Sequence, residues 1–198
     1  MSGALWPVSL RRGPVGVRSL RLRDAGTWQQ LRGAQVDWLG PWEATLPPDT
    51  QPPFASHRAM VKAMLARART GQSLPFVVTW EGDMVGLLTV NGIILGSSRS
   101  ANLGYWVTRT HAGRGIIPTA VAMICDHLFE VAQLHRIEIA IRPENERSLR
   151  VVEKLGFTEV GLAPSYLHIA GQWRDHRLFQ LVVDDVEAKV VDRLPKHQ

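Results

Sequence analysis

The pattern of apolar residues changes from alternating to helical early in the chain. Residues 15–23 alternate apolar and basic side chains toward their end, which predicts a β-strand. Apolar residues then recur at helical spacing over 24–39, and Asp24 is placed to cap this predicted helix. Residues 40–55 carry five prolines and are expected to form no regular element. A second helix, begun by a capping serine, is predicted over 56–70.

Strands and helices also mix in the rest of the chain. The predicted elements are strands at 74–80, 84–91 and 101–108, a helix at 113–133, a strand at 135–142, a helix at 145–155, and strands on either side of residues 171–172. A helix between two strands indicates a parallel βαβ crossover. The order therefore predicts an α+β fold, with a mixed, mostly antiparallel sheet of about seven strands flanked by about four helices.

Length and composition indicate one globular domain. Of the 198 residues, 45% are hydrophobic and 21% charged, which is typical of a folded chain. We expect one domain over 1–185 and a polar C-terminal tail over 186–198. The single cysteine, Cys125, excludes an internal disulfide and favours a reducing, cytoplasmic location. We expect no membrane partner, because no apolar stretch reaches the ~20 residues of a spanning helix. We expect no signal peptide, because the two arginines of residues 1–12 follow the apolar stretch and no small-residue cleavage site comes after them.

The net charge of +5 leaves two interpretations open. An arginine-rich surface explains it, and so does attraction to an anionic partner such as a phosphorylated cofactor or an RNA-rich particle. The chain has no aromatic–basic nucleic-acid motif, and its histidines lack metal-ligand spacing. We therefore expect no bound metal and no direct nucleic-acid motif.

Residues 105–116 join the end of a strand, a loop with Gly113 and Gly115, and the start of a helix. The first N–H groups of a helix lack internal partners and lie at its positive end, so they can bind an anion. The glycines let a phosphate approach the backbone, and Arg109 and Arg114 add charge. A plain strand-to-helix turn is the alternative. The loop lacks the third glycine of a dinucleotide fingerprint and the lysine of a Walker loop.

Asn145 lies where a predicted strand gives way to a helix, and Ser148 lies one turn further along the same face. Asn145 is expected to cap that helix. A serine at this position can also bond back to the backbone or face solvent.

Together the two segments resemble the GNAT superfamily of acyl-CoA-dependent N-acyltransferases. The glycine loop is similar to its pyrophosphate-binding motif, and the stretch over 145–157 is similar to its second motif. The chain resembles most closely the RimJ/RimL-type ribosomal-protein N-acetyltransferases, and within them the RimJ type. This similarity covers about residues 15–185. It is carried by Gly-Tyr-Trp-Val at 104–107, Gly-Arg-Gly-Ile at 113–116 and Tyr-Leu-His-Ile-Ala-Gly-Gln-Trp-Arg-Asp-His at 166–176.

The resemblance implies an α/β/α sandwich with a splayed sheet and acetyl-CoA as the acetyl donor. It implies that backbone groups of 106–108 pair with the pantetheine arm, that amides of 111–116 hold the pyrophosphate, and that Asn145 and Ser148 lie beside the thioester. The implied cofactor-binding residues are Trp106, Val107, Thr108, Arg109, His111, Ala112, Gly113, Arg114, Gly115, Ile116, Asn145 and Ser148.

Two departures from the family pattern bear on the chemistry. Thr110 stands where relatives often have Gln or Arg, and Val152 stands where many carry a tyrosine acid. Ser148 is therefore the candidate general acid, and a backbone N–H near Val107 is expected to stabilise the oxyanion. Cys125 lies in an apolar run without a positive neighbour, so we expect core packing rather than a nucleophile.

The general base stays open between two carboxylates, Glu43 in the proline-rich loop and Glu138 on the strand over 135–142. Relatives often place a glutamate on that strand at the position of Ala140, two residues further along. Either glutamate is equally compatible with an ordinary surface position. The loop over 40–55 is long for a simple connection and is a candidate substrate wall.

The candidate substrate-contacting residues are Trp42, Tyr105 and Tyr166. Trp38 and Trp42 either flank the incoming peptide end or pack under the loop.

The leading functional hypothesis is acetylation of a protein N-terminal α-amine, with a ribosomal protein as the expected partner. An α-amine has a pKa of ~7.7–8 against ~10.4 for lysine, so it needs little help to lose its proton. Two alternatives are a small-molecule amine acetyltransferase, acting on polyamines or antibiotics, and a non-catalytic acyl-CoA-binding protein. Either a monomer or a homodimer is compatible with the sequence.

Overall fold

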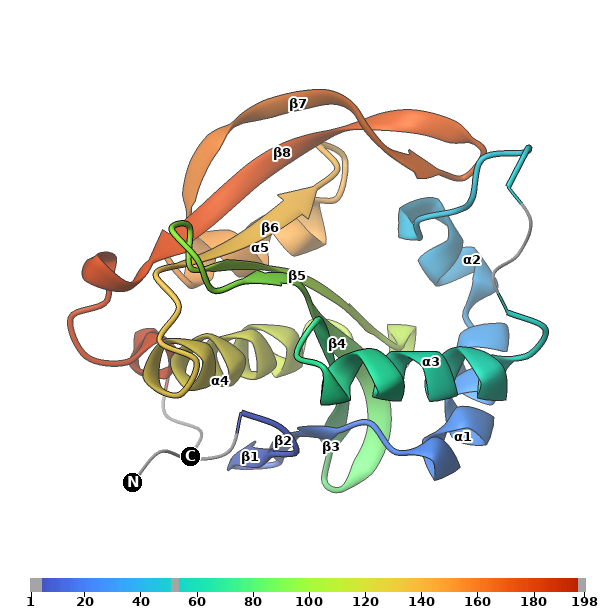
Figure 1. The fold of residues 1–198 in the computed structure, drawn as a ribbon, viewed down its shortest axis with the longest axis horizontal. Coiled ribbons are helices and arrows are strands. Elements are labelled where there is room, and N and C mark those ends of the chain that lie inside the picture. Colours follow the sequence, from blue (N-terminus) through green and yellow to red (C-terminus); the bar gives the residue numbers. More distant parts are fainter. Residues whose placement is uncertain (1–4, 51–53, 196–198) are drawn as a thin grey trace.

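A computed structural model describes residues 5–50 and 54–195 as one eight-stranded sheet with helices on both faces (Figure 1). Its elements are β1 (Ser9–Arg12), β2 (Val15–Ser19), α1 (Ala25–Gly33), α2 (Val36–Leu39), α3 (His57–Arg69), β3 (Ser73–Trp80), β4 (Asp83–Ile94), β5 (Ser100–Val107), α4 (Ile116–Glu130), β6 (Arg136–Ile141), α5 (Glu146–Lys154), β7 (Thr158–Ile169) and β8 (Gln172–Val182). The strand order is β1-β2-β3-β4-β5-β6-β8-β7, and among these neighbours only β5 and β6 run parallel.

This architecture confirms the predicted mixed α/β/α fold and the predicted parallel crossover, which runs through α4, but two elements differ. The strand β1 was not predicted, because its four residues form an exposed edge with one apolar side chain. The helix predicted over 24–39 is two helices, since Gln35 leaves the helical conformation between α1 and α2. Asp24 precedes α1 without capping it. Its carboxylate accepts instead from the Arg18 guanidinium and from the Arg21 N–H.

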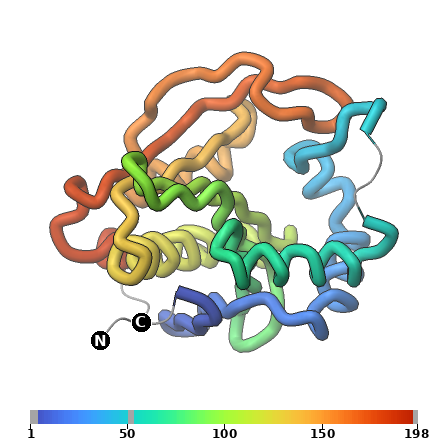
Figure 2. The backbone as a smooth tube through the Cα atoms, in the orientation of Figure 1, coloured from blue at the N-terminus to red at the C-terminus, as the bar shows by residue number. Residues whose placement is uncertain are grey.

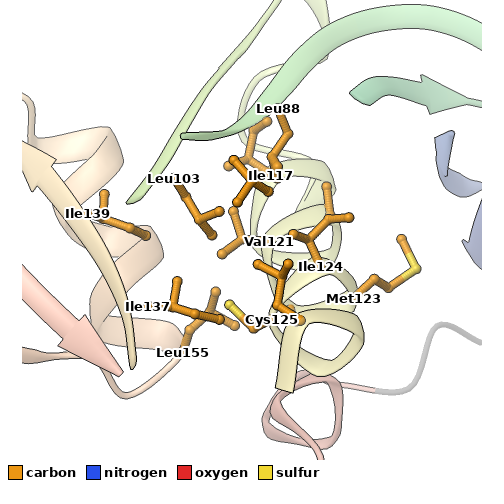
Figure 3. Packing of buried hydrophobic residues seen from close by; sticks show 14 of the residues in the cluster. Leu88, Leu103, Ile117, Val121, Met123, Ile124, Cys125, Ile137, Ile139 and Leu155 are labelled. Carbon is orange, nitrogen blue, oxygen red and sulfur yellow. The ribbon is translucent and has the colours of Figure 1, made fainter. Parts of the chain in front are cut away.

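Two apolar layers hold the helices to the sheet. The larger lies between the sheet and the α4–α5 side, and the smaller lies under α1 and α3. The helix α4 is buried along nearly its whole length, as expected for a crossover helix inside a domain. Cys125 is fully buried on this helix, among Ile137 and Leu155 (Figure 3). This burial confirms the prediction that Cys125 is a core residue, and it raises the pKa of the thiol.

The parallel pair β5–β6 opens soon after it forms. Residues 100–102 of β5 pair with residues 136–138 of β6, and beyond them neither strand pairs with the other. On its far side β6 stays paired with β8 along its full length, while β5 stays paired with β4. The sheet therefore splays between residues 103–107 and 139–141, where the resemblance predicted a gap.

The β7–β8 hairpin arches across this gap and meets the chain that follows α2 (Figure 2). Ala44 forms a β-bridge with Ile169, and the Thr45 N–H donates to the His168 carbonyl at 2.8 Å. From the other side, the Arg142 guanidinium donates to the Pro41 carbonyl at 2.7 Å. The first part of the predicted irregular loop, residues 41–45, is thus held beside the splay, and its residues 40–42 form a short 3-10 helix that the sequence did not predict. Residues 51–53 of this loop lie outside the described residues.

The chain beyond Asp185, where a polar tail was predicted, still contacts the domain. Val190 is fully buried, and the N–H groups of Val190 and Val191 donate to the Asp126 carboxylate of α4 at 2.7 and 3.1 Å. Packed structure therefore continues past the predicted boundary.

Candidate functional site

Two cavities open on opposite faces of the splayed sheet. The cationic cavity, of about 450 Å³, lies between β5, the start of α4 and α5. The aromatic cavity, of about 350 Å³, lies on the α1–α3 face under the β7–β8 hairpin. Both cavities have six lining residues in common. These are Leu39, Trp42, Tyr105, Trp106, Asn145 and Ser148, which we call the junction.

The floor of the cationic cavity is the turn between β5 and α4. Gly113 and Gly115 have φ of 80° and 74°, in the left-handed region that favours glycine, and open space lies where a Cβ would stand. Within the described chain, no N–H group of residues 113–117 donates to another residue. Pro118 follows and has no N–H to offer. The turn therefore presents a cluster of free donors at the positive end of a long buried helix.

Side chains hold this turn in place from beneath. His111 Nδ1 lies 2.9 Å from the Thr108 hydroxyl and 3.1 Å from the Thr110 hydroxyl. The Arg109 N–H donates to the Gln35 side-chain carbonyl at 2.9 Å. Thr110, which departs from the family pattern, thus belongs to a hydrogen-bonded group that fixes the loop.

The walls of the cationic cavity bear positive charge only. Arg109, Arg147, Arg150 and Lys154 line it, and no Asp or Glu is among its described lining residues. The Arg147 guanidinium also lies 4.6 Å from the centre of the Trp38 ring. The three cations from α5 were not predicted from the sequence. Their spacing of three and four residues would have revealed them, because it aligns them on the face next to Ser148.

Most of the predicted cofactor-binding residues lie around this cavity. Ten of the twelve line it, and the other two are Thr108 and Arg114. The Thr108 side chain is buried beneath the turn, and Arg114 is exposed.

The splay leaves backbone groups of β5 unpaired. The Thr108 N–H donates to the Val85 carbonyl of β4, so Val107, one residue earlier, directs its N–H and carbonyl to the opposite side, into the gap. The Trp38 indole N–H donates to the Val107 carbonyl at 2.9 Å. Trp38 thus lies in the cationic cavity and outside the aromatic one.

Three polar side chains mark the junction. The side-chain carbonyl of Asn145 accepts from the Ser148 N–H at 3.2 Å, which confirms the predicted helix cap. The Tyr105 hydroxyl is buried beside Ser148 and makes no regular hydrogen bond within the described chain. Burial raises the pKa of Tyr105, and the neighbouring Ser148 hydroxyl offsets part of that rise. Two protonated hydroxyls therefore meet where the cavities join. Val152, at the position of the absent tyrosine, is core.

The aromatic cavity has few charges. Its one lining carboxylate among the described residues, Glu43, pairs with Arg32 at 2.7 Å. Arg142 also lines it, with its guanidinium 5.3 Å from the Trp42 ring centre. Of the two predicted bases, Glu43 lines the cavity and Glu138 does not, whereas Ala140 does.

The β7–β8 hairpin contributes a histidine that the sequence analysis did not single out. His176 lines the aromatic cavity and is only 3% exposed. The ring of Tyr166, a predicted substrate residue, lies 5.5 Å from it, but Tyr166 lines neither cavity. No local pattern distinguished His176, because the hairpin register alone brings it to the cavity.

Residues 5–50 and 54–195 contain no cluster of three or more His, Cys, Asp or Glu side chains arranged to bind a metal. None of their helices is long and apolar enough to cross a membrane.

Comparison with known proteins assigns the family. Residues 15–158 match the model of the acetyltransferase (GNAT) domain. The chain is 36% identical over 180 residues to the probable N-acetyltransferase YjcK of Bacillus subtilis, spanning 90% of this chain and 99% of that protein. It is 32% identical over 105 residues to the ribosomal protein uS5-alanine N-acetyltransferase of Escherichia coli, spanning 53% and 54%. The structure of Mycobacterium smegmatis RimJ in complex with CoA-disulfide is similar with a TM-score of 0.88 and 37% identity, covering 96% and 94%. The chain belongs to the GNAT family of acetyltransferases.

Proposed function

We propose that the protein transfers an acetyl group from acetyl-CoA to the α-amine of a protein N-terminus. One observation carries this proposal: a cationic cavity and an aromatic cavity enter the splayed sheet from opposite faces and meet at the junction. Such an arrangement lets two substrates approach from separate sides and react at one point.

The cationic cavity fits a diphosphate-bearing donor. Free N–H groups of residues 113–117 and the cations of the walls would hold the diphosphate, while the Val107 carbonyl, which faces the gap, would accept from a pantetheine amide. Acetyl-CoA would supply an acetyl group activated as a thioester. The similarity to the M. smegmatis RimJ that was solved with CoA-disulfide supports this donor.

The junction supplies groups suited to acyl transfer. The Val107 N–H faces the gap and would donate to the oxygen of the acyl carbonyl as negative charge develops there. Ser148 would donate a proton to the departing sulfur, and the buried Tyr105 hydroxyl beside it would support that role.

The aromatic cavity fits a peptide end better than a polyamine. A polycation needs several unpaired carboxylates, but the single described carboxylate in this lining is neutralised by Arg32. The aromatic side chains Trp28, Trp42 and Trp106 offer apolar surface for the first residues of a peptide. The similarity to the E. coli enzyme that acetylates the alanine of uS5 supports a ribosomal protein as acceptor.

A substrate panel tests the proposal. Purified protein and acetyl-CoA would be incubated with tetrapeptide amides that begin with each amino acid type, and with spermidine and an aminoglycoside as small-molecule amines. Thiol release would measure turnover, and mass spectrometry would locate the acetyl group. We expect turnover on the α-amine of a subset of peptides. Turnover on spermidine or the aminoglycoside alone would overturn the peptide assignment, and CoA binding without any turnover would indicate a non-catalytic protein.

A further inference from the structure

We propose that His176 is the general base, taking the proton from the acceptor amine at its Nε2. This inference rests on the proposed function and assigns the role that the sequence left open between Glu43 and Glu138. His176 lies on β8, at the wall of the aromatic cavity, through which the acceptor would reach the junction.

The hydrogen bonds of the imidazole leave one nitrogen available. His176 Nδ1 lies 3.0 Å from the Arg174 carbonyl, which can only accept, so Nδ1 bears the hydrogen and Nε2 carries the lone pair. Within the described chain His176 Nε2 has no hydrogen-bond partner. It is also not one of the fully buried polar atoms that lack a partner, so it is accessible from the cavity. The lone pair is therefore open to whatever occupies the cavity.

The surroundings keep this ring neutral, as a base must be before it reacts. Burial lowers the pKa of His176, and Arg142 at the end of β6 lowers it further. The Arg174 carbonyl, Glu144 before α5 and Asp175 on β8 act in the opposite direction without cancelling the decrease. From β7 the ring of Tyr166 covers the imidazole.

The other candidates are less suited to the role. Glu43 lines the same cavity, but its carboxylate is bonded to Arg32 at 2.7 Å, so taking a proton would leave that guanidinium without its partner. Glu138 lines neither cavity. Among the described residues that line the aromatic cavity, His176 is the one imidazole, and its Nε2 is a neutral acceptor that no cation pairs with.

In the proposed step, the amine nitrogen forms a bond to the acetyl carbon, and Nε2 of His176 takes the proton that the nitrogen loses. The carbon–sulfur bond of the thioester breaks, its electron pair stays on sulfur, and Ser148 protonates the sulfur. The imidazolium then releases its proton to water, and Ser148 recovers one.

The variant H176N tests the role of Nε2 separately from the structural role of the ring. Its amide nitrogen stands near the position of Nδ1 and can still donate to the Arg174 carbonyl, while no atom replaces Nε2. The matched control is H168N. His168 is a second buried histidine of the hairpin that binds Thr45 and lines neither cavity.

The readout is kcat/KM against pH, with the tetrapeptide amide or small amine that turns over fastest in the panel. In the wild type, a neutral base and a neutral amine are both required, so the slope on the acid side steepens from one to two below the pKa of His176. We expect H176N to lose on the order of 10²–10³-fold in kcat/KM, to keep a slope of one, and to recover with rising pH as hydroxide replaces the base. H168N should keep the wild-type profile.

Two results would overturn the proposal. One is H176N within threefold of the wild type, and the other is a large loss with an unchanged pH profile, which would indicate a purely structural role. Failure of all peptides would contradict only the acceptor assignment, since the profile can be measured with any amine that turns over.

A measurement without substrate is independent of activity. Side-chain ¹⁵N spectra of the free protein should show one histidine, absent in H176N, with its hydrogen on Nδ1 and a pKa below 6.5. A charged ring at pH 7, or a hydrogen on Nε2, would contradict the role.

Discussion

The cationic and aromatic cavities share a junction, but the chain builds them in different ways. The cationic cavity takes its lining from three stretches, 38–42, 105–118 and 145–154. The aromatic cavity also draws one or two residues from each of α1, α3, β4 and the two strands of the hairpin. The cationic cavity offers several N–H donors and cations that could share one ligand. In the aromatic cavity, each polar side chain holds a position that no other residue duplicates. We therefore expect graded losses from changes in the cationic cavity and specific losses from changes at the aromatic cavity and the junction.

The largest effect is expected where a substitution moves the strand that both cavities share. Gly86 of β4 lies opposite Val107, and a Cβ at Gly86 would stand 2.2 Å from the Trp106 carbonyl oxygen. G86A must push β4 and β5 apart, so we expect it to lower the free energy of unfolding by about 3 kcal/mol and to impair both cavities together. Chemical denaturation and CoA titration would measure this.

A matched control for G86A is the same change at Gly26 in α1, where a Cβ meets no atom within 4 Å. Because glycine is unfavourable inside a helix, G26A should raise stability by about 0.5–1 kcal/mol. A G86A protein as stable as the wild type would mean that the strands tolerate separation at the splay.

The next effect concerns the junction, where a change should affect the chemical step more than either binding step. S148A removes the candidate acid, and we expect kcat to fall on the order of 10²-fold, with the Kd for CoA changed less than threefold. Y105F should have a smaller effect, because the ring still fills its place. If Y105F is the slower variant and S148A is nearly normal, the proton comes from the phenol instead.

The same contrast between the cavities explains what the sequence could predict. The turn over 113–117 depends on two glycines two residues apart in the chain, and the cap at Asn145 depends on a contact three residues away. Such local relations follow from spacing, so the glycine turn and the helix cap could be predicted.

His176 reaches its cavity through a hairpin whose register shifts between Ala163 and Leu167. Glu43 meets Arg32 only because the chain after α2 is held beside Ile169. These placements depend on strand register and on an irregular loop, neither of which is encoded in a local pattern. The strand β1 was missed for a related reason, since an exposed edge with one apolar residue shows no alternation.

A more modest effect is expected from single charges of the cationic cavity. R147Q and K154Q each remove one cation from an exposed wall, so we expect the Kd for CoA to rise two- to fivefold, or roughly 0.5–1 kcal/mol. Calorimetry at two salt concentrations would show a smaller difference between variant and wild type at high salt, because ions screen exposed charges.

R23Q is the matched control for R147Q and K154Q. It makes the same change in net charge at an exposed residue outside the cavity, and it should leave the Kd unchanged. Equal losses in all three variants would assign the effect to net charge.

The smallest effect is expected at the ion pair of the aromatic cavity, where the partners are partly exposed and their removal should change stability by less than about 1 kcal/mol. The pKa of the nearby His57 is a more sensitive measure of this ion pair. His57 has a pKa lowered by burial first and then by Arg32, against the opposing influence of Glu43. E43Q removes the group that favours the imidazolium, so the pKa of His57 should fall further, whereas R32Q should raise it. NMR titration would detect both shifts.

R32Q also leaves Glu43 unpaired, so spermidine should bind this variant more tightly than it binds the wild type. Equal binding would mean that pairing does not exclude polycations from the cavity, and that its shape does.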